Sequence, residues 1–461
     1  MRLLRRRTDE EGSLREWART LPERHGGRGT FWVVLGVLAL ALVARVVAAV
    51  NGFDFRHGSD ADMYERLAAH LYREGEFGLP GSANPYDFAP GAPLFATGVY
   101  TLIGDASPVA ARLGLALAGT VGVLVVYLLG RRLAGPLAGV VAAAVMAIYP
   151  PALFYNSLLA GEVLAMVTVP AAVLAFLWAA DRGRSPWAWA VPGLLLGLTA
   201  FTRPEYLALT ALLGLLAVGV VTWRSSLVRG LAAGALMVAS FVVVVAPWAI
   251  HVSNELDRFV PVSTGGGKAL FIGTYLPGDG LHEGVKQHLL HRLRGGDPIP
   301  QDRLRRIPMN PLLDRVAARH PDLPRDAALG RVGRENLIRW ATGEPRAFGQ
   351  MMAGKIEHMW RTSGPAGGAL HYLVLALGLA GLALLALRRR WEVLPIVLLL
   401  AGISLIGGLL LAGTRRNLPV MPLVIALAGV TVAYATAWSR ERLERRRPPR
   451  AEPIESALVH H

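Results

Sequence analysis

A short polar stretch, GSDADMY at residues 58–64, follows directly on an apolar run and carries two carboxylates and a tyrosine. Asp60 and Tyr64 are four residues apart, so they would share one face of a helix. Ser59 followed three residues later by Asp62 forms a capping-box-like pattern, and apolar residues continue at helical spacing to residue 71. A carboxylate at a helix start contributes about 0.3–1 kcal/mol through the helix dipole. This structural role accounts for Asp62, and it leaves Asp60 as a candidate general base.

Further ionisable residues stand within or at the ends of apolar runs. They are Arg45, Arg112, Glu162, Arg203, Glu205, His251, Arg415 and Arg416. An ionisable side chain inside a membrane span costs about 2.5–3.5 kcal/mol on insertion scales, so such residues indicate function by default. Arg45 and Arg112, taken singly, also fit side chains that reach to the membrane surface. Taken together, we expect these residues to line a cavity at one membrane face that suits an anionic, lipid-carried substrate.

The elements that must position these residues are apolar segments. The 461 residues are 53% hydrophobic and 18% charged, with a mean hydropathy of +0.40, which is typical of an integral membrane protein. Ten runs have the roughly 17–25 residues that a membrane span needs. They fall near 31–50, 107–130, 134–149, 158–180, 187–203, 206–223, 230–250, 367–387, 392–412 and 418–438. The chain has no cysteine, which excludes disulfides and cysteine nucleophiles.

Arginines gather in alternate connections between these runs. The groups are MRLLRRR at the start, Arg131 and Arg132, Arg182 and Arg184, Arg224 and Arg229, residues 388–390, and the tail SRERLERRRPPR. The positive-inside rule therefore predicts that these connections and both termini are cytoplasmic. The net charge of +15 is then explained by topology and lipid headgroups, and we expect no nucleic-acid partner.

This topology divides the chain into five segments. We expect a basic cytoplasmic N-terminus at 1–30, which leads into an uncleaved anchor. A transmembrane module at 31–250, with an external loop at 51–106, is followed by an external segment at 251–366. We expect C-terminal transmembrane helices at 367–438 and a basic cytoplasmic tail at 439–461. Glycines and prolines predict strand and turn early in the second external segment, in VPVSTGGGKALFIGTYLPGDG, with phosphate binding as the alternative role of its glycine run. Helical spacing follows from about Arg325 to Trp360. The predicted fold is thus an all-α membrane protein with about ten spans, interfacial helices in the first external loop and a small mixed external segment.

Several motifs, in order over about residues 30 to 430, carry a family resemblance. They are DADMY, FAPGAPLFATGVYTLIGDASPVAARL, GRRLAGPLAG, YPPALFYNSLLAGEVL, GLLLGLTAFTRPEYL, APWAIHVSNELDRFVPVSTGGGKALFIG and RRNLPVMPL. This order resembles the bacterial glycosyltransferases of the GT-C superfamily, in the branch of protein-mannosyltransferases, aminoarabinose transferases and rhizobial galacturonosyltransferases. The resemblance implies transfer of a sugar from a polyprenyl-phosphate donor to a lipid, glycan or protein acceptor at the outer face of a bacterial plasma membrane.

The resemblance also implies roles for residues. Asp60 matches the catalytic base of the first external loop, in a pattern that includes Tyr64, and Glu162 matches an acidic position at the outer start of the fourth span. Arg203, Pro204 and Glu205 match an arginine-proline-acid turn. Two positions depart from the pattern: His251 stands where relatives commonly have arginine, and the loop around Lys268 lacks the usual asparagines. These departures concern the identity of the donor more than the type of reaction.

The residues fit this chemistry independently of the resemblance. A phosphate leaving group needs cations rather than a strong acid, which Arg203, Lys268, Arg415 or Arg416 can provide, whereas the acceptor hydroxyl needs a base. Single displacement with Asp60 as base would invert the anomeric centre. We assign donor or acceptor binding to Asp62, Tyr64, Glu162, Arg203, Glu205, His251, Lys268, Arg415 and Arg416.

Other classes of function stay open at this stage. They are a secondary transporter or flippase of an anionic or lipid-linked substrate, and a lipid-binding protein without activity. No cofactor is predicted with certainty, and a divalent metal ion is left open. The stretch HEGVKQHLLH does not form a metalloprotease helix, because Lys286 stands where the second histidine would be.

Overall fold

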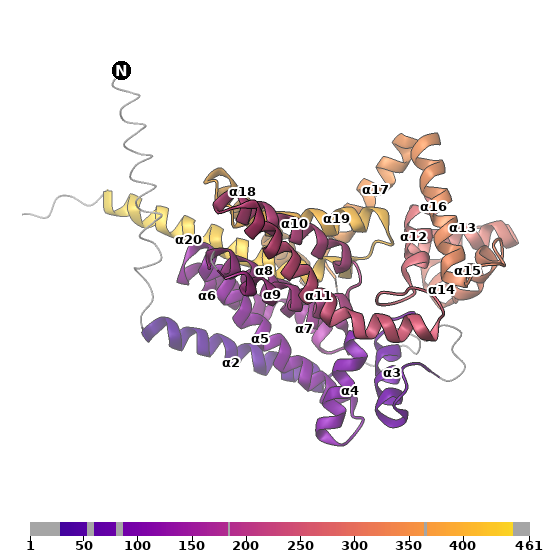
Figure 1. Ribbon diagram of the computed structural model, residues 1–461, viewed down its shortest axis with the longest axis horizontal. Coiled ribbons are helices and arrows are strands. Elements are labelled where there is room, and N and C mark those ends of the chain that lie inside the picture. The colour runs from indigo at the N-terminus through magenta and orange to yellow at the C-terminus, as the bar shows by residue number, and fades with distance from the viewer. Residues whose placement is uncertain (1–27, 53–59, 80–85, 183–184, 364–366, 446–461) are drawn as a thin grey trace, which may run out of the picture.

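The protein is all-helical throughout its described residues. The computed structural model describes residues 28–52, 60–79, 86–182, 185–363 and 367–445, and these contain no β-strand. The bundle consists of α2 (Arg28–Val50), α5 (Pro108–Ala134), α6 (Pro136–Ile148), α7 (Pro150–Asn156), α8 (Gly161–Asp181), η1 (Pro186–Trp189), α9 (Ala190–Thr202), α10 (Tyr206–Arg224), α11 (Leu227–Glu255), α18 (Gly368–Leu387), α19 (Val393–Leu409), η3 (Thr414–Val420) and α20 (Met421–Arg445). Figure 1 shows α2 and α20 running along the long axis of the molecule. The predicted all-α membrane fold is confirmed.

Seven helices are long and apolar enough to cross a membrane, and the bent pair α6 and α7 brings the number to eight. Two further predicted spans, 187–203 and 392–412, coincide with apolar helices of only 10–17 residues, Pro186–Thr202 and Val393–Leu409. Every predicted span thus corresponds to a helical segment. Length and composition do not establish the count of ten, which stays a prediction, whereas the multi-pass character is clear.

A buried arginine stabilises the break between α6 and α7. The two helices meet at Tyr149, which has an extended backbone, and they are bent by 51°. The last carbonyls of a helix lack intrahelical partners, and here the guanidinium of Arg45 accounts for two of them: it donates to the carbonyl oxygens of Met146 at 3.0 Å and Ala147 at 3.2 Å. Arg45 is only 1% exposed. The guanidinium therefore does not reach to the membrane surface. Its contacts with the two carbonyl oxygens give this buried charge a structural role.

The last helix, α20, lies at the centre of the bundle. Its residues from Met421 to Val430 are all buried. Glycines bring it close to its neighbours: a Cβ added at Gly429 would lie 2.3 Å from the carbonyl oxygen of Ala138 in α6, and one at Gly381 in α18 would lie 2.1 Å from that of Leu427. Small residues at such crossings let membrane helices pack backbone against backbone.

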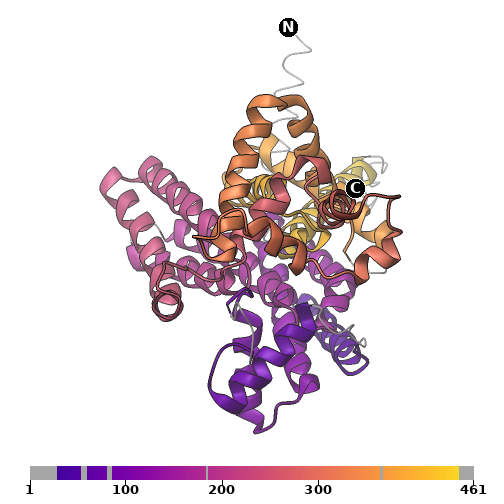
Figure 2. The same cartoon turned by 90° about the vertical axis from the view of Figure 1, so that its right-hand side faces the viewer.

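Two groups of helices extend from one end of the bundle. The first group lies between α2 and α5 and contains α3 (Asp60–Glu74) and α4 (Gly91–Ile103). The second segment lies between α11 and α18, external to the bundle, and contains α12 (Gly266–Thr274), η2 (Leu276–Gly278), α13 (His282–Arg294), α14 (Gln301–Arg306), α15 (Asn310–Ala317), α16 (Arg325–Gly343) and α17 (Pro345–Met359). Figure 2, which views this end, shows the two groups in different sectors of the same face. The first-loop helix predicted from residue 60 onward is confirmed, as are the later helices of the second segment. Ser59, its predicted cap, lies outside the described residues.

The prediction of strand around residues 261–280 is wrong, whereas turns are present at residue 265 and at residues 279–280. The stretch GGKALFIGT forms α12, because its apolar residues pack into the core of the external segment: Phe271 and Ile272 are buried against Leu329 and Val332 of α16. The glycines that suggested a turn permit close contact instead. A Cβ at Gly267 would lie 1.9 Å from the carbonyl oxygen of Asp326.

A buried lysine joins the external helices to the bundle. The Nζ of Lys355 in α17 donates to the carbonyl oxygen of Gly273 at the end of α12 and to that of Gly408 in α19, both at 2.6 Å. Lys355 is 1% exposed. The contact fixes α12, and with it Lys268 of the same helix, relative to the end of a bundle helix.

Candidate active site

Four helix ends bring six of the predicted site residues together. Asp60 is the first residue of α3, and Glu162 lies in the first turn of α8. Arg203 and Glu205 flank Pro204 in the turn between α9 and α10, and Arg415 and Arg416 belong to η3. These elements come from distant parts of the chain, so the cluster exists only in the folded protein.

Ion pairs connect the cluster into two branches. In the first, Arg415 pairs with the carboxylate of Asp60, and its Nη1 lies 3.7 Å from the Oε1 of Glu162. The same Glu162 oxygen accepts from the Nη2 of Arg203 at 2.5 Å. In the second branch, the Nη1 of Arg416 lies 3.5 Å from the Oε1 of Glu205. Three arginines therefore face three carboxylates.

Exposure falls from the Asp60 end of the cluster to its interior. The side chains of Asp60 and Arg415 are 39% and 45% exposed, whereas those of Glu162 and Glu205 are 4% and 8% exposed. A carboxylate that must meet a substrate can do so only at the open end. The buried carboxylates instead hold the arginines in place.

The charges around Asp60 favour its ionised form. Burial by itself would raise the pKa of the Asp60 carboxyl, but the Arg415 guanidinium, with smaller contributions from Lys268 and Arg203, holds it below its usual value. Asp60 is thus a carboxylate at neutral pH. It can accept a proton, and its partner Arg415 weakens it as a base as long as the pair is intact.

Arg203 keeps one hydrogen-bond donor unused. Its Nε is buried and has no partner among the described residues, although its Nη2 contacts Glu162. A buried N–H without an acceptor is costly, and native proteins keep such groups where a water molecule or ligand supplies the acceptor. The donor lies within the charged cluster and suits an anionic ligand.

The short helix η3 is fixed by a residue that sequence reasoning missed. Asn417 is fully buried, and its Nδ2 donates to the carbonyl oxygens of Met359 at 2.8 Å and Arg361 at 3.0 Å, at the end of α17. These bonds hold η3 against α17 and so orient the two arginines that precede Asn417. An amide inside the otherwise apolar stretch NLPVMPL was the signal for this role.

The glycine run before α12 binds a carboxylate of the protein itself. The Oδ2 of Asp326 accepts from the backbone N–H of Gly267 at 3.2 Å, and its Oδ1 accepts from that of Lys268 at 3.1 Å. Asp326 therefore occupies the helix start that was a predicted alternative for phosphate. The Lys268 side chain is half-buried and contributes positive charge at Asp60.

Three ionisable residues predicted to face the same cavity form no ion pair with the charged cluster among the described residues. Arg45 contacts the break between α6 and α7, as described above, and Arg112 lies beside Gly52 at the end of α2. The His251 ring belongs to an aromatic group in which its Nε2 lies 3.4 Å from the Tyr86 hydroxyl and its ring packs near Trp248. Arg45 thus uses its charge to satisfy the backbone of the bundle, whereas the predicted binding role of His251 stays a prediction.

Two predicted residues on α3 flank the cluster. Tyr64 packs edge-on against Phe88, with ring centroids 5.6 Å apart, and the described residues show no hydrogen bond between Tyr64 and Asp60. Asp62 is half-buried in the first turn of α3, but it is Asp60 that forms the pair with Arg415. The two aspartates therefore have different surroundings despite their spacing.

Within the described part of the chain, no group of three histidine, aspartate or glutamate side chains is arranged to hold a metal ion. The carboxylates of the cluster face arginines, and cationic partners of this kind leave little negative charge to attract a divalent cation.

A family model for dolichyl-phosphate-mannose-protein mannosyltransferases matches residues 87–251. This segment contains Glu162, Arg203 and Glu205, and the match confirms the predicted resemblance to the GT-C superfamily. No curated protein sequence matches the chain.

Two solved structures are among those similar to this chain. One is the archaeal oligosaccharyltransferase AglB from Archaeoglobus fulgidus in complex with an inhibitory peptide and a dolichol-phosphate, at 14% identity and a TM-score of 0.48, with coverage of 93% of this chain and 53% of that chain. The other is ArnT from Cupriavidus metallidurans bound to undecaprenyl phosphate, at 17% identity and a TM-score of 0.40, with coverage of 91% and 82%. The chain thus spans about half the length of the archaeal enzyme.

Proposed function

From the match of residues 87–251 to a protein mannosyltransferase family of the GT-C superfamily, we propose that this multi-pass membrane protein is a glycosyltransferase. Its donor is a sugar carried on a polyprenyl phosphate, and its acceptor is a hydroxyl of a lipid, glycan or protein. The observation that carries the proposal is the network of Asp60, Arg415, Glu162 and Arg203. In this network the partly exposed carboxylate of Asp60 lies next to arginines that pair with buried Glu162, at the end of the bundle from which the external helices extend.

The arginines serve the leaving group in this mechanism. The bond between the anomeric carbon and the phosphate oxygen breaks, and its electron pair stays on the phosphate. Arg415 and Arg203 stabilise the charge that develops there, because guanidinium groups donate charge-assisted hydrogen bonds to phosphate oxygens. The buried Nε of Arg203, which has no acceptor among the described residues, is suited to this contact.

Asp60 serves the acceptor. The acceptor oxygen forms the new bond to the anomeric carbon, and its proton passes to the Asp60 carboxylate, which is ionised because Arg415 lowers its pKa. A base in this position contributes about 10²–10⁴-fold to the rate. The attack is a single displacement opposite the leaving phosphate, so the anomeric configuration inverts.

Arg415 couples the two halves of the reaction. Its Nη2 pairs with Asp60 and its Nη1 faces Glu162, so a phosphate that draws the guanidinium away from Asp60 removes the main cause of the lowered pKa. Asp60 then becomes a stronger base only once the donor is bound.

A transfer assay tests the proposed activity. Purified protein in lipid nanodiscs is incubated with an extract of polyprenyl-phosphate sugars and the matching envelope fraction. We expect release of free polyprenyl phosphate and an acceptor that gains one sugar of inverted configuration. Movement of the intact donor across the membrane without cleavage would assign a flippase or transporter instead.

The orientation is a proposal as well: Asp60 faces outward from a bacterial plasma membrane, and both termini are cytoplasmic. Because the chain contains no cysteine, single cysteines report topology without background. A membrane-impermeant maleimide should label Asp297→Cys, in the exposed connection after α13, in intact cells, and it should label Ser439→Cys near the end of α20 only after permeabilisation. The reverse pattern would overturn the orientation and the outer-face active site.

A further inference from the structure

A cavity lies at the end of the bundle opposite the charged cluster. It has a volume of about 790 Å³, and its apolar wall consists of Leu128, Ala171, Leu174, Ala175 and Val191. Its polar lining consists of Arg131, Arg132, Asp181 and Arg390, with Trp178 and Tyr434 beside them. The cavity is therefore apolar along one wall and cationic at its rim.

The length of α8 places this cavity at the opposite membrane face from Asp60. Glu162 of the charged cluster and Asp181 of the cavity are 19 residues apart in this helix, which corresponds to about 28 Å at the helical rise of 1.5 Å per residue. The hydrocarbon core of a bilayer is about 30 Å thick. One end of α8 thus lies at each interface, and the cavity cannot share a headgroup with the proposed active site.

Aromatic residues mark the interface at this end. Trp178 is 40% exposed, and Trp187 and Trp223 are 73% and 78% exposed. The guanidinium of Arg182 lies 4.5 Å from the ring centroid of Trp178, and that of Arg388 lies 4.2 Å from that of Tyr434. Tryptophan and tyrosine concentrate at the headgroup level of membranes, where arginine contacts lipid phosphates.

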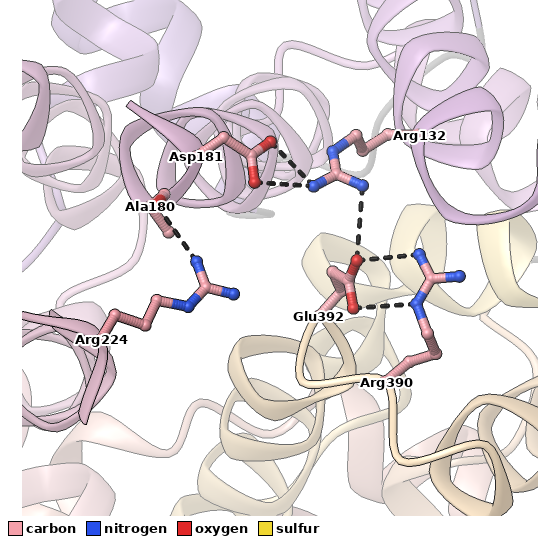
Figure 3. Close-up of polar contacts among 6 residues, drawn as sticks. All are labelled: Arg132, Ala180, Asp181, Arg224, Arg390 and Glu392. Carbon is pink, nitrogen blue, oxygen red and sulfur yellow. Dashed lines mark hydrogen bonds and ion pairs between the residues drawn. The ribbon is translucent and has the colours of Figure 1, made fainter. Parts of the chain in front are cut away.

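Two of the three rim arginines, Arg132 and Arg390, are held by carboxylates. Figure 3 shows the guanidinium of Arg132 between the carboxylates of Asp181 and Glu392, and Arg390 paired with Glu392 through two hydrogen bonds. Arg131 is exposed, and no ion pair to it occurs among the described residues. The cavity lining therefore contains three arginines against one aspartate, with Arg131 available to an anion.

We propose that this cavity binds a membrane phospholipid with an anionic headgroup, taken from the leaflet opposite Asp60. The phosphate lies at Arg131 and Arg390, and an acyl chain lies along the apolar wall of α5 and α8. Two observations select this occupant over a peptide or a soluble anion: the wall belongs to helices that span the membrane, and the cationic rim lies at headgroup depth. The inference does not depend on the proposed glycosyltransferase activity.

Native mass spectrometry of the full chain tests the headgroup contact. The protein is released from nanodiscs of phosphatidylglycerol and phosphatidylcholine, and retained lipid is counted. We expect one retained phosphatidylglycerol, and binding weakened about fivefold in Arg131→Gln, which corresponds to about 1 kcal/mol for one interfacial arginine. Arg229→Gln, an exposed arginine at the same end whose Nη1 contacts Ser225, is the matched control and should leave retention unchanged. Equal losses in both variants would reduce the effect to general surface charge and overturn the site.

A second pair of variants tests the acyl wall. Ala171→Phe fills the cavity from a half-buried position, and Ala39→Phe adds the same ring at an exposed position of α2. We expect loss of the retained lipid only in Ala171→Phe, with both variants matching the parent in thermal unfolding. Retention that survives in Ala171→Phe, or phosphatidylcholine retained as well as phosphatidylglycerol in the parent, would contradict the proposal.

Discussion

The two ends of the bundle use the same types of side chain for different purposes. Around Asp60, three arginines and three carboxylates meet, and one carboxylate and one arginine stay partly exposed. At the opposite end, Arg132 and Arg390 bond to Asp181 and Glu392, and these pairs join the ends of α5, α8 and α19 (Figure 3). The two ends differ in the hydrogen-bonding groups that have no partner among the described residues.

The unused hydrogen-bonding capacity separates the two networks. Near Asp60, the Nε of Arg203 is buried without an acceptor among the described residues, whereas Arg132, Asp181, Arg390 and Glu392 include no such atom. A buried donor without an acceptor needs a water molecule or a ligand, whereas the more exposed arginines of the opposite end are open to solvent and to lipid headgroups. The comparison predicts that substitutions at the two ends affect different measurements.

The largest effect on stability is expected at the buried pair. In Arg203→Gln, Glu162 keeps only the Arg415 contact at 3.7 Å and remains a buried charge, so the free energy of unfolding should fall by about 3–5 kcal/mol. Chemical denaturation in detergent measures the free energy of unfolding of the parent, of Arg203→Gln and of the double variant Glu162→Gln/Arg203→Gln. The double variant should be more stable than the single one. A loss below about 1 kcal/mol in the single variant would mean that the pair is well hydrated.

Replacement of Arg415 should weaken donor binding. One charge-assisted hydrogen bond contributes about 1.5–3 kcal/mol, so Arg415→Gln should lower the affinity for a polyprenyl-phosphate sugar by roughly ten- to a hundred-fold. Titration of the donor by tryptophan fluorescence or calorimetry checks the value. Arg390→Gln, at the opposite end, is the control and should bind donor normally. Equal affinities in parent and Arg415→Gln would remove this arginine from the donor site.

The pH profile sharpens the role of the same pair. Arg415 holds the pKa of the Asp60 carboxyl below its usual value, so the carboxylate that acts as base persists as the pH falls, until the pH reaches that lowered pKa. In Arg415→Gln, burial is left as the main influence and it raises the pKa. The acid limb of kcat/KM should therefore move to higher pH in the variant. An unmoved acid limb would show that another group controls it.

The smallest effect is expected at the rim of the opposite end. The side chains of Arg132 and Asp181 are 30% and 48% exposed, and exposed ion pairs contribute about 0–1 kcal/mol. Asp181→Asn should lower stability by no more than that and leave sugar transfer unchanged, because Glu392 still binds Arg132. A strong loss of transfer would indicate that the two ends are coupled.

The sequence predicted much of the fold for a physical reason. Apolar runs in a membrane have to form helices, because the bilayer offers no other partner for backbone polar groups. The same argument does not apply outside the membrane. There, the glycines of GGGKALFIG were read as a turn, although buried Phe271 and Ile272 make the stretch helical.

The membership of the charged cluster was only partly predictable. Helix ends at the same interface indicated that Glu162, Arg203 and Arg415 meet, but sequence position could not show which charges turn inward to the backbone. Arg45 does so at the break after α6, since the exposed carbonyls of that helix end need donors. Asn417 was missed because its partners, the carbonyls at the end of α17, are 56 and 58 residues away.

The central claim is that Asp60 takes the proton of the acceptor, and one comparison of two variants tests it most directly. Asp60→Asn and Asp62→Asn make the same chemical change two residues apart, and asparagine keeps the shape and capping ability of aspartate. In nanodiscs with a matched donor and acceptor, Asp60→Asn should bind donor and lose about 10²-fold or more in turnover, whereas Asp62→Asn should keep most of its activity. Similar activities in the two variants, or a larger loss in Asp62→Asn, would contradict the account.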